Sequence, residues 1–265
     1  MSHESSSRPG APHPPVDHTG ADGRDLIREA FDYGGGILSS SGATHWKITL
    51  ARQKESLREW AGSVGLLLKA ADYVPRLLRG GMEHDYFREG ERVIKMTRQG
   101  MFGLSPGIDL AMVSSSQDAR RFHLWEATPL EYLERLLLHN ELVPGLNRLE
   151  GVICQENDDL AIVTSQPRFD IVAVSETEIA TWFAAQGFQQ VTDSAYYRED
   201  DNLGVFDAHD KNVVRAGSIL IPFDVIPCHP QGGFLTFIAD TLAAGHRLSV
   251  VRNVTTVNSP RFPKL

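Results

Sequence analysis

The segment VFDAHDKNVV, residues 205–214, carries an unusual density of side chains that can hold a metal ion or move a proton. Six of its positions contain two Asp, one His, one Lys and one Asn, and apolar residues flank them on both sides. Polar clusters between short apolar runs are typical of turns. A turn does not need so many ionisable groups, so this segment is the first candidate for a chemical site.

Charged residues also interrupt the apolar runs elsewhere in the sequence. Lys95 lies in VIKM, Asp224 lies in ILIPFDVI, and Asp207 ends LGVFD. A buried charge is costly unless it is paired or bound to a metal. Each residue alone has an ordinary explanation, at a strand end or on a solvent-facing side. The three residues together, with Asn212 beside them, favour a shared site.

The spacing indicates which chemistry such a site would perform. Asn212 follows Asp207 by five positions, and Asp224 follows Asn212 by twelve. Phosphoryl transfer requires a carboxylate to accept the nucleophile's proton, and an amide oxygen with a second carboxylate to hold Mg²⁺. It also requires a lysine for the phosphates and a glutamate that holds this lysine in place. The sequence contains candidates for each of these parts.

At this point the sequence resembles the protein-kinase-like superfamily. DAHDKN is similar to the D-x-x-x-x-N catalytic loop, FDV to the DFG motif without its glycine, and VIKM to the V-A-I-K strand motif. The blocks VIK, ATPLEYLERLLLHN, VTSQP and FDAHDKN resemble most the Ser/Thr/Tyr kinase-like domain found in polyvalent proteins of bacterial mobile elements. The resemblance covers residues 76–230.

The resemblance implies an α+β, two-lobed fold with an antiparallel β N-lobe and a reduced, mainly helical C-lobe. It implies ATP and Mg²⁺ as cofactors. Asp207 would be the catalytic base, Asn212 and Asp224 would bind Mg²⁺, and Lys95 would contact the α- and β-phosphates. Gly80 and Gly81 would lie in a hairpin that closes over the phosphates, and Val93 would lie above the base. The segment VTSQP would be the hinge whose backbone meets the adenine, through Thr164, Ser165 and Gln166.

Two glutamates compete as the partner of Lys95. Glu131 also completes a capping box with Thr128, a role that needs no nucleotide. Glu134 lies deeper in the same helix, on the flank of a leucine stripe. We choose Glu131 because of the block EYL and its distance to the following strand.

The sequence departs from protein kinases around Asp207. Val205 and Phe206 replace the His and Arg of the HRD motif, so control through an activation-loop phosphate is not expected. His209 stands two positions after Asp207, as in the H-G-D-x-H-x-x-N loop of aminoglycoside and choline kinase relatives, where protein kinases commonly carry lysine. The phosphoacceptor therefore stays open between a protein hydroxyl and a small molecule.

Two other function classes remain as alternatives. A pseudokinase would bind nucleotide or act as a scaffold without phosphotransfer. A metallohydrolase would use Asp207, His209, Asp224 and His229, but the sequence has no His-x-x-x-His spacing to support it.

The net charge of −8 argues against a nucleic-acid partner, and no apolar run is long enough to cross a membrane. Cys154 and Cys228 are expected to be reduced thiols, in keeping with a cytoplasmic protein.

The expected organisation follows from composition and periodicity. We expect a disordered tail (1–24), a helical extension (25–75), an N-lobe (76–166) and a C-lobe (167–265) that the extension or a partner chain could complete. Helices are expected at 25–34 (ending at Gly34–Gly36), at 48–74, after Thr128, after Ser175 and at 232–245. Strands are expected at 76–97, 148–155, 159–166, 203–207 and 218–226, with a short hairpin inside 98–127.

Overall fold

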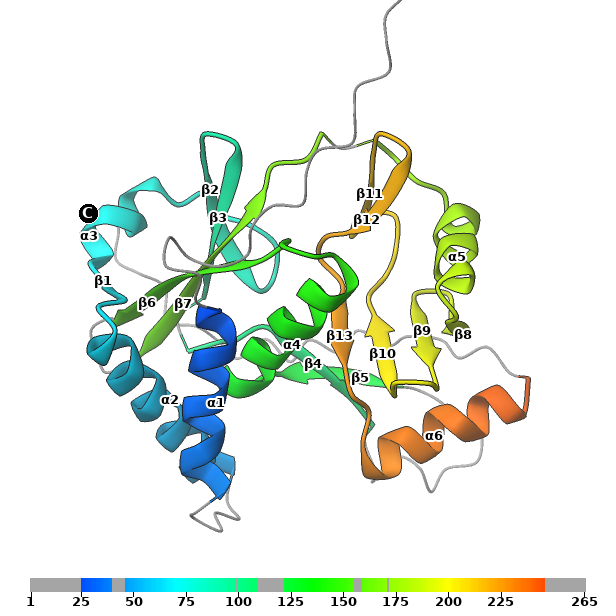
Figure 1. Cartoon of the computed structure of the whole chain (residues 1–265), viewed down its shortest axis with the longest axis horizontal. Helices are drawn as coiled ribbons and strands as arrows, with labels where there is room; N and C mark the ends of the chain where they lie inside the picture. Colours follow the sequence, from blue (N-terminus) through cyan, green and yellow to red (C-terminus); the bar gives the residue numbers. More distant parts are fainter. Residues whose placement is uncertain are drawn as a thin grey trace, which may run out of the picture.

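The computed structural model describes residues 25–39, 46–98, 100–108, 122–154, 159–170 and 172–245. The N-terminal segment that was expected to be disordered lies outside these residues. Within them the chain forms a mixed α+β fold with six α-helices and four β-sheets (Figure 1). None of the described helices is both long and apolar enough to span a membrane.

The largest sheet has five strands and carries Lys95. Its neighbours are antiparallel except for the short parallel pair at one edge. Side chains alternate along each strand, so Ile94 and Met96 enter an apolar cluster on one face while Lys95 points to the other. In spatial order the strands are β1 (Leu67–Leu68), β6 (Arg148–Cys154), β7 (Leu160–Pro167), β3 (Arg92–Thr97) and β2 (His84–Glu89).

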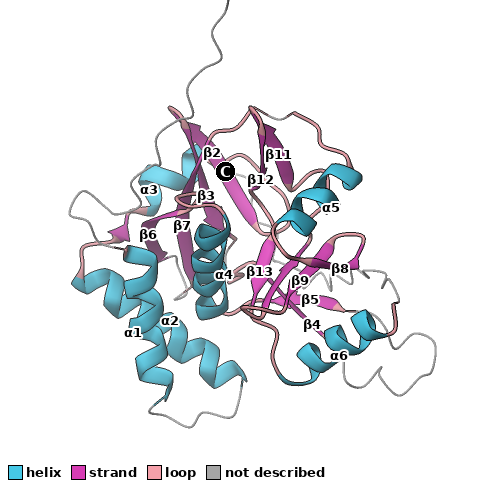
Figure 2. Ribbon diagram, turned by 45° about the vertical axis from the view of Figure 1, so that its right-hand side comes forward, coloured by secondary structure: helices cyan, strands magenta, loops and turns pink. Residues whose placement is uncertain are grey.

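Helices cover both faces of this sheet. The short helices α3 (Ala70–Tyr73) and η1 (Val74–Arg76) lie beside the cluster around Ile94. The longer helices α1 (Leu26–Ser39), α2 (Trp46–Ser63) and α4 (Pro129–Leu142) share one apolar core with β6 and β7. Figure 2 shows α4 between the five-stranded sheet and β13, where it contacts both parts of the molecule.

The start of α4 follows its sequence signals. Thr128 caps the helix by accepting a hydrogen bond from the Glu131 amide, and the Glu131 carboxylate accepts one from the Thr128 amide in return. Pro129 occupies the first helical position, where its missing N–H costs nothing. The predicted capping box is therefore confirmed, and so is the one formed by Ser175 and Glu178 at the start of α5 (Glu176–Ala185).

The C-terminal part of the chain is richer in strands than predicted. Residues 172–245 contain six strands and two helices, so the expected mainly helical composition is wrong. Four strands form a second sheet, two form a hairpin, and the hairpin expected inside 98–127 is confirmed by β4 and β5. The bounds are β4 (Leu104–Gly107), β5 (His123–Glu126), β8 (Gln189–Thr192), β9 (Ala195–Arg198), β10 (Leu203–Phe206), β11 (Val213–Ala216), β12 (Ile219–Pro222), β13 (Ile226–Cys228) and α6 (Gly232–Ala243).

Three predicted boundaries are wrong for local reasons. Helix α1 continues through its glycines, and Gly34 packs so closely on α4 that a Cβ would lie 2.5 Å from Leu130 Cδ2. Helix α2 ends at Ser63 because Gly65 follows in the left-handed region, with φ 75°. The strand expected from residue 76 is only an isolated bridge between Leu78 and Tyr86.

Gly151 provides a test of the close packing at the β1 edge. Its φ is 152°, and an added Cβ would lie 2.5 Å from the Leu66 carbonyl oxygen, a backbone atom that cannot move aside easily. We expect Gly151→Ala to lower the free energy of unfolding by about 2 kcal/mol or more. Gly35→Ala is the control, because a Cβ there meets nothing within 4 Å and should stabilise α1 by about 0.5–1 kcal/mol. Urea unfolding measures both, and equal stabilities would contradict the packing described.

Candidate functional site

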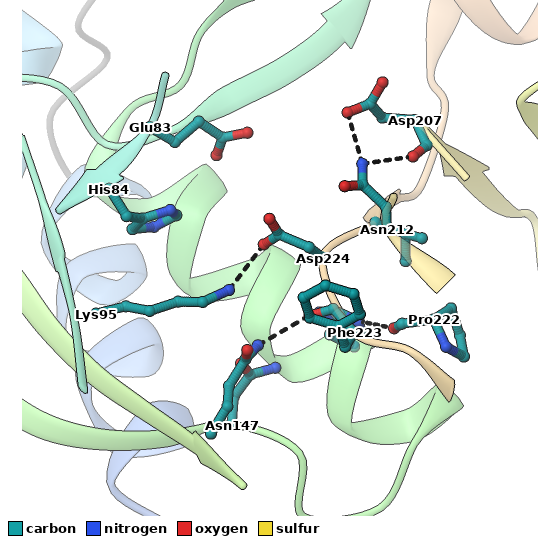
Figure 3. Close-up of polar contacts among 12 residues, drawn as sticks. Glu83, His84, Lys95, Asn147, Asp207, Asn212, Pro222, Phe223 and Asp224 are labelled. Carbon is teal, nitrogen blue, oxygen red and sulfur yellow. Dashed lines mark hydrogen bonds and ion pairs between the residues drawn. The ribbon is translucent and has the colours of Figure 1, made fainter. Parts of the chain in front are cut away.

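An ion pair joins two of the predicted site residues across the molecule. Lys95 Nζ, on β3, lies 2.8 Å from Asp224 Oδ1, in the connection between β12 and β13 (Figure 3). The Lys95 side chain is 13% exposed and that of Asp224 39% exposed. Burial opposes ionisation of Asp224, but the charge of Lys95, together with those of other nearby groups, holds the pKa of its carboxyl well below the ordinary value. Asp224 is therefore an anion at neutral pH and can still reach a ligand.

Asp207 and Asn212 form a second contact within the segment VFDAHDKNVV. Asn212 Nδ2 donates hydrogen bonds to the Asp207 carbonyl oxygen at 2.7 Å and to Asp207 Oδ2 at 2.8 Å. Asp207 has a left-handed backbone with φ 56°, which is unusual for a residue other than glycine. Such strained positions are frequent at functional sites, where surrounding contacts maintain them. Here the Asn212 amide supplies two of those contacts.

Backbone hydrogen bonds connect these two pairs. The Asn212 carbonyl accepts from the Phe223 amide at 3.0 Å and from the Asp224 amide at 3.3 Å. Asp207, Asn212, Asp224 and Lys95 are therefore linked in one continuous series of contacts. The structure thus brings together the four residues that the spacing singled out.

His209 lies against Asp207 on the same loop. Its Nε2 is 3.5 Å from Asp207 Oδ1, and its Nδ1 accepts a hydrogen bond from the Lys211 amide at 3.1 Å. Both side chains are about one-fifth exposed, at 20% for His209 and 18% for Asp207. The pair is partly accessible, and the imidazole lies next to the carboxylate.

A buried network beside Lys95 was missed by the sequence reasoning. Arg135 Nη1, on α4, bonds Glu83 Oε2 at 2.5 Å, and His84 Nε2 lies 2.8 Å from the Tyr132 hydroxyl. Burial raises the pKa of Glu83 while Arg135 opposes that shift, and burial lowers the pKa of His84 to about 3. An arginine inside the stripe of leucines was the available sequence signal, because a charge there requires a partner.

Glu131, the predicted partner of Lys95, does not occupy that place. Its carboxylate accepts from the Thr128 amide at 2.7 Å, at the very start of α4. Lys95 pairs instead with Asp224. The alternative, Glu134, is half-buried, and burial raises its pKa while His229 opposes that shift. The prediction that Glu131 holds Lys95 is wrong because capping occupies its side chain and the helix turns Arg135 toward the site.

The predicted hinge is a strand rather than a connecting loop. Thr164 and Ser165 lie within β7, paired with β3 on one side and β6 on the other. The backbone there is part of the sheet, so the prediction that it meets an adenine edge is wrong for these two residues. Gln166 lies beyond the last β6 pair, and its side chain donates to the Phe223 carbonyl oxygen at 2.9 Å. Thr164 and Gln166 alternate with Ser165, so their side chains share the other face of the strand.

The glycines predicted to cover the phosphates lie in the loop between Leu78 and Tyr86. The Gly80 amide donates to Asp85 Oδ1 at 3.2 Å, and a Cβ on Gly80 would lie 2.2 Å from the His84 carbonyl oxygen. Gly81 has open space around it. The loop leads directly into Glu83 and His84, beside Lys95 in Figure 3. Val93 lies on the same strand as Lys95, two positions before it, and therefore on the same face.

A multi-ligand metal centre of the hydrolase type is not assembled. Within the described parts of the chain, no three His, Cys, Asp or Glu side chains are grouped so that they could hold a metal ion. His229 lies apart from the proposed set, with its Nδ1 donating to the Asn202 carbonyl oxygen at 3.0 Å. The metallohydrolase alternative therefore loses its support.

Alanine substitutions of the two loop glycines should change the free energy of unfolding by different amounts. We expect Gly80→Ala to lower the free energy of unfolding by about 2 kcal/mol, because its methyl group would force the loop away from the His84 carbonyl. Gly81→Ala should change it by less than about 0.5 kcal/mol. Urea unfolding of the two variants compares them directly. Equal stabilities would show that the loop does not pack as described.

His139 makes the stability depend on pH. Its Nε2 donates to the Pro222 carbonyl oxygen, and burial lowers its pKa from 6.5 to about 4. Between these two pH values the unfolded chain binds a proton at His139 that the folded chain does not bind. The contribution of neutral His139 to stability is therefore complete above pH 6.5 and falls as the pH drops toward 4. We expect the free energy of unfolding to fall by up to about 1.4 kcal/mol per pH unit because of this group.

The variant His139→Gln isolates that contribution. Glutamine can donate from its Nε2 to the same carbonyl but does not titrate. Urea unfolding of both proteins at a series of pH values through this window should give a shallower dependence for the variant. Identical slopes would rule out a neutral buried His139.

One comparison with known proteins returned a family match. Residues 50–227 of the 265-residue chain match the family described as Serine/Threonine/Tyrosine Kinase found in polyvalent proteins. Searches of curated proteins and of solved structures returned no match. The match spans about two thirds of the chain and includes Lys95, Asp207, Asn212 and Asp224. The chain therefore belongs to the family of serine/threonine/tyrosine kinases found in polyvalent proteins.

Proposed function

We propose that this protein is an ATP- and Mg²⁺-dependent phosphotransferase. The observation that carries the proposal is the continuous set of contacts from Asp207 through Asn212 and Asp224 to Lys95. These residues come from one strand of the five-stranded sheet and from two separate loops, yet they meet at one place. Phosphoryl transfer depends mainly on the positioning of charges, so such an assembly supports it.

The donor set fits a magnesium ion. Mg²⁺ prefers oxygen ligands and is usually held by one or two carboxylates together with phosphates of the substrate. Asp224 offers a carboxylate that is ionised and 39% exposed. Asn212 donates to Asp207 through Nδ2, so its Oδ1 would supply the amide oxygen for the cation. When bound, Mg²⁺ would neutralise charge on the phosphates of ATP.

The protein groups would divide the remaining work. Lys95 would exchange its contact with Asp224 for the α- and β-phosphates. Asp207 would accept the proton of the attacking hydroxyl, with Asn212 holding its carboxylate in place. His209, at 3.5 Å from Asp207, would meet the transferred phosphoryl group. The loop of Gly80 and Gly81 would cover the phosphates.

The domain organisation enters the same proposal. We propose a two-lobed arrangement, with residues 76–166 as the N-lobe, 167–265 as the C-lobe and 25–75 as a helical extension. Helices α1 and α2 share the core of the five-stranded sheet, which supports the extension as a structural part of the N-lobe. The phosphoacceptor would be a protein hydroxyl or a small molecule, in the cytoplasm.

One observation favours a pseudokinase as the second candidate. Lys95 pairs with Asp224, the carboxylate proposed for the metal, and the glutamate predicted to hold Lys95 is engaged in a capping box. A protein held in this arrangement would bind nucleotide weakly or without turnover. Turnover of ATP therefore separates the two functions.

The kinase proposal is tested with γ-labelled ATP and Mg²⁺. The parent protein should show autophosphorylation or slow hydrolysis, and Asp207→Ala should lower the rate by about 10²- to 10⁴-fold because the proton acceptor is removed. Asp224→Asn should lose the response to Mg²⁺. Asp200→Asn, on an exposed turn between β9 and β10, is the control and should retain the parent's rate.

The results of these experiments distinguish the kinase from the pseudokinase. Activity that survives both Asp207→Ala and Asp224→Asn would refute the assignment of this site. Binding of Mg-ATP in a thermal-shift experiment without turnover would support the pseudokinase.

A further inference from the structure

Three buried side chains hold the backbone on both sides of Asp224. His139 Nε2 bonds the Pro222 carbonyl at 2.5 Å, Gln166 Nε2 bonds that of Phe223 at 2.9 Å, and Arg135 Nε bonds that of Val225 at 3.2 Å. These donors are 2%, 5% and 6% exposed. Figure 3 shows this stretch of backbone beside Lys95, with Pro222 and Phe223 engaged from one side.

The effect of these bonds is to immobilise a segment whose side chain remains available. A buried carbonyl without a partner is costly, so each of the three bonds opposes movement of the backbone. The Asp224 amide is also engaged, by the Asn212 carbonyl at 3.3 Å. The carboxylate of Asp224 contacts Lys95 and is the group that would meet a ligand.

Arg135 differs from the other two donors because it reaches a second element. Its Nε holds Val225, while its Nη1 holds Glu83, in the loop that begins with Gly80 and Gly81. A guanidinium is planar and presents its donors in a fixed fork, so one arginine can set the relative position of two acceptors. Arg135 therefore connects α4, the glycine-containing loop and the Asp224 segment.

We propose that Arg135 is a positioning residue that holds Asp224 in the orientation required for Mg-nucleotide. It lies on α4, the helix from which a glutamate for Lys95 was predicted, and it acts on the segment of the aspartate rather than on the lysine. The proposal rests on the proposed phosphotransferase function. Glu83 balances the buried charge of Arg135 and orients its guanidinium.

The test must separate this role from the cost of an unpaired buried charge. Arg135→Met alone leaves the Glu83 carboxylate without its partner and could unfold the protein. The double variant Arg135→Met with Glu83→Gln removes that charge as well as the bond to Val225. Glu83→Gln alone is the comparator. A glutamine oxygen still accepts a hydrogen bond from Arg135, Asp224 still supplies a nearby negative charge, and the bond to Val225 is kept.

Arg198→Met is the matched control elsewhere in the fold. Like Arg135, Arg198 bonds a carboxylate, that of Asp201, and a backbone carbonyl, that of Gln186 at 3.1 Å. It lies on β9 and is not one of the residues of the proposed site. Its loss should cost stability without affecting Asp224.

The first measurement is amide hydrogen exchange without any nucleotide. Peptides that contain residues 222–226 should exchange at least about tenfold faster in the double variant than in Glu83→Gln or Arg198→Met, because a hydrogen bond to a charged group has been lost. Equal exchange in all three proteins would overturn the proposal.

The second measurement is the affinity for ATP with and without Mg²⁺. In the double variant the Mg²⁺ concentration for half-maximal binding should rise at least about tenfold, while binding of metal-free ATP should change little. An equal loss under both conditions would mean a general structural role and would overturn the proposal. If the parent protein itself binds no Mg-ATP, the proposed function fails, and the exchange experiment still decides whether Arg135 holds the Asp224 segment.

Discussion

The ion pair between Lys95 and Asp224 is the interaction on which the rest of the site depends. It connects β3 of the five-stranded sheet with the turn between β12 and β13, residues that lie 129 positions apart in the chain. The Lys95 side chain is 13% exposed and that of Asp224 39%, so loss of either partner would leave the other charge partly buried and unpaired. The contact therefore joins the second half of the chain to the sheet.

Helix α4 holds the backbone next to this contact in place. Its capping box fixes where it begins, and Leu133, Leu136 and Leu137 bury one side in the core shared with α1, α2 and the sheet. Arg135 and His139, one helical turn apart, then face the Asp224 segment and bond its carbonyls. The same helix therefore stabilises the fold and positions the proposed metal ligand.

The opposite side of the site is built on a strained loop. Asp207 keeps a left-handed backbone directly after the buried strand β10, and the Asn212 side chain bonds both its carbonyl and its carboxylate. The Asn212 carbonyl meanwhile holds the amides of Phe223 and Asp224. One asparagine thus keeps both carboxylates in a fixed relation, which suits a family whose members are described as kinases. The direction of the Asp224 pKa shift is consistent with a carboxylate kept ionised for a cation.

The sequence by itself determined the local structure and the chemical residue types. The capping boxes at Thr128 and Ser175, the strand that carries Lys95, and the spacing of Asp207, Asn212 and Asp224 follow from short-range rules, and the family was recognised from the same blocks. Only the tertiary structure decided which charges meet. The sequence predicts Glu131 as the partner of Lys95, but the capping box engages its carboxylate. No local pattern predicts the contacts that Arg135, Glu83 and the side chain of Gln166 make. Partners far apart in sequence leave no local pattern, because their pairing depends on how sheets and helices pack. The predicted hinge fails at Thr164 and Ser165 for the same reason, because β3 and β6 both pair with them.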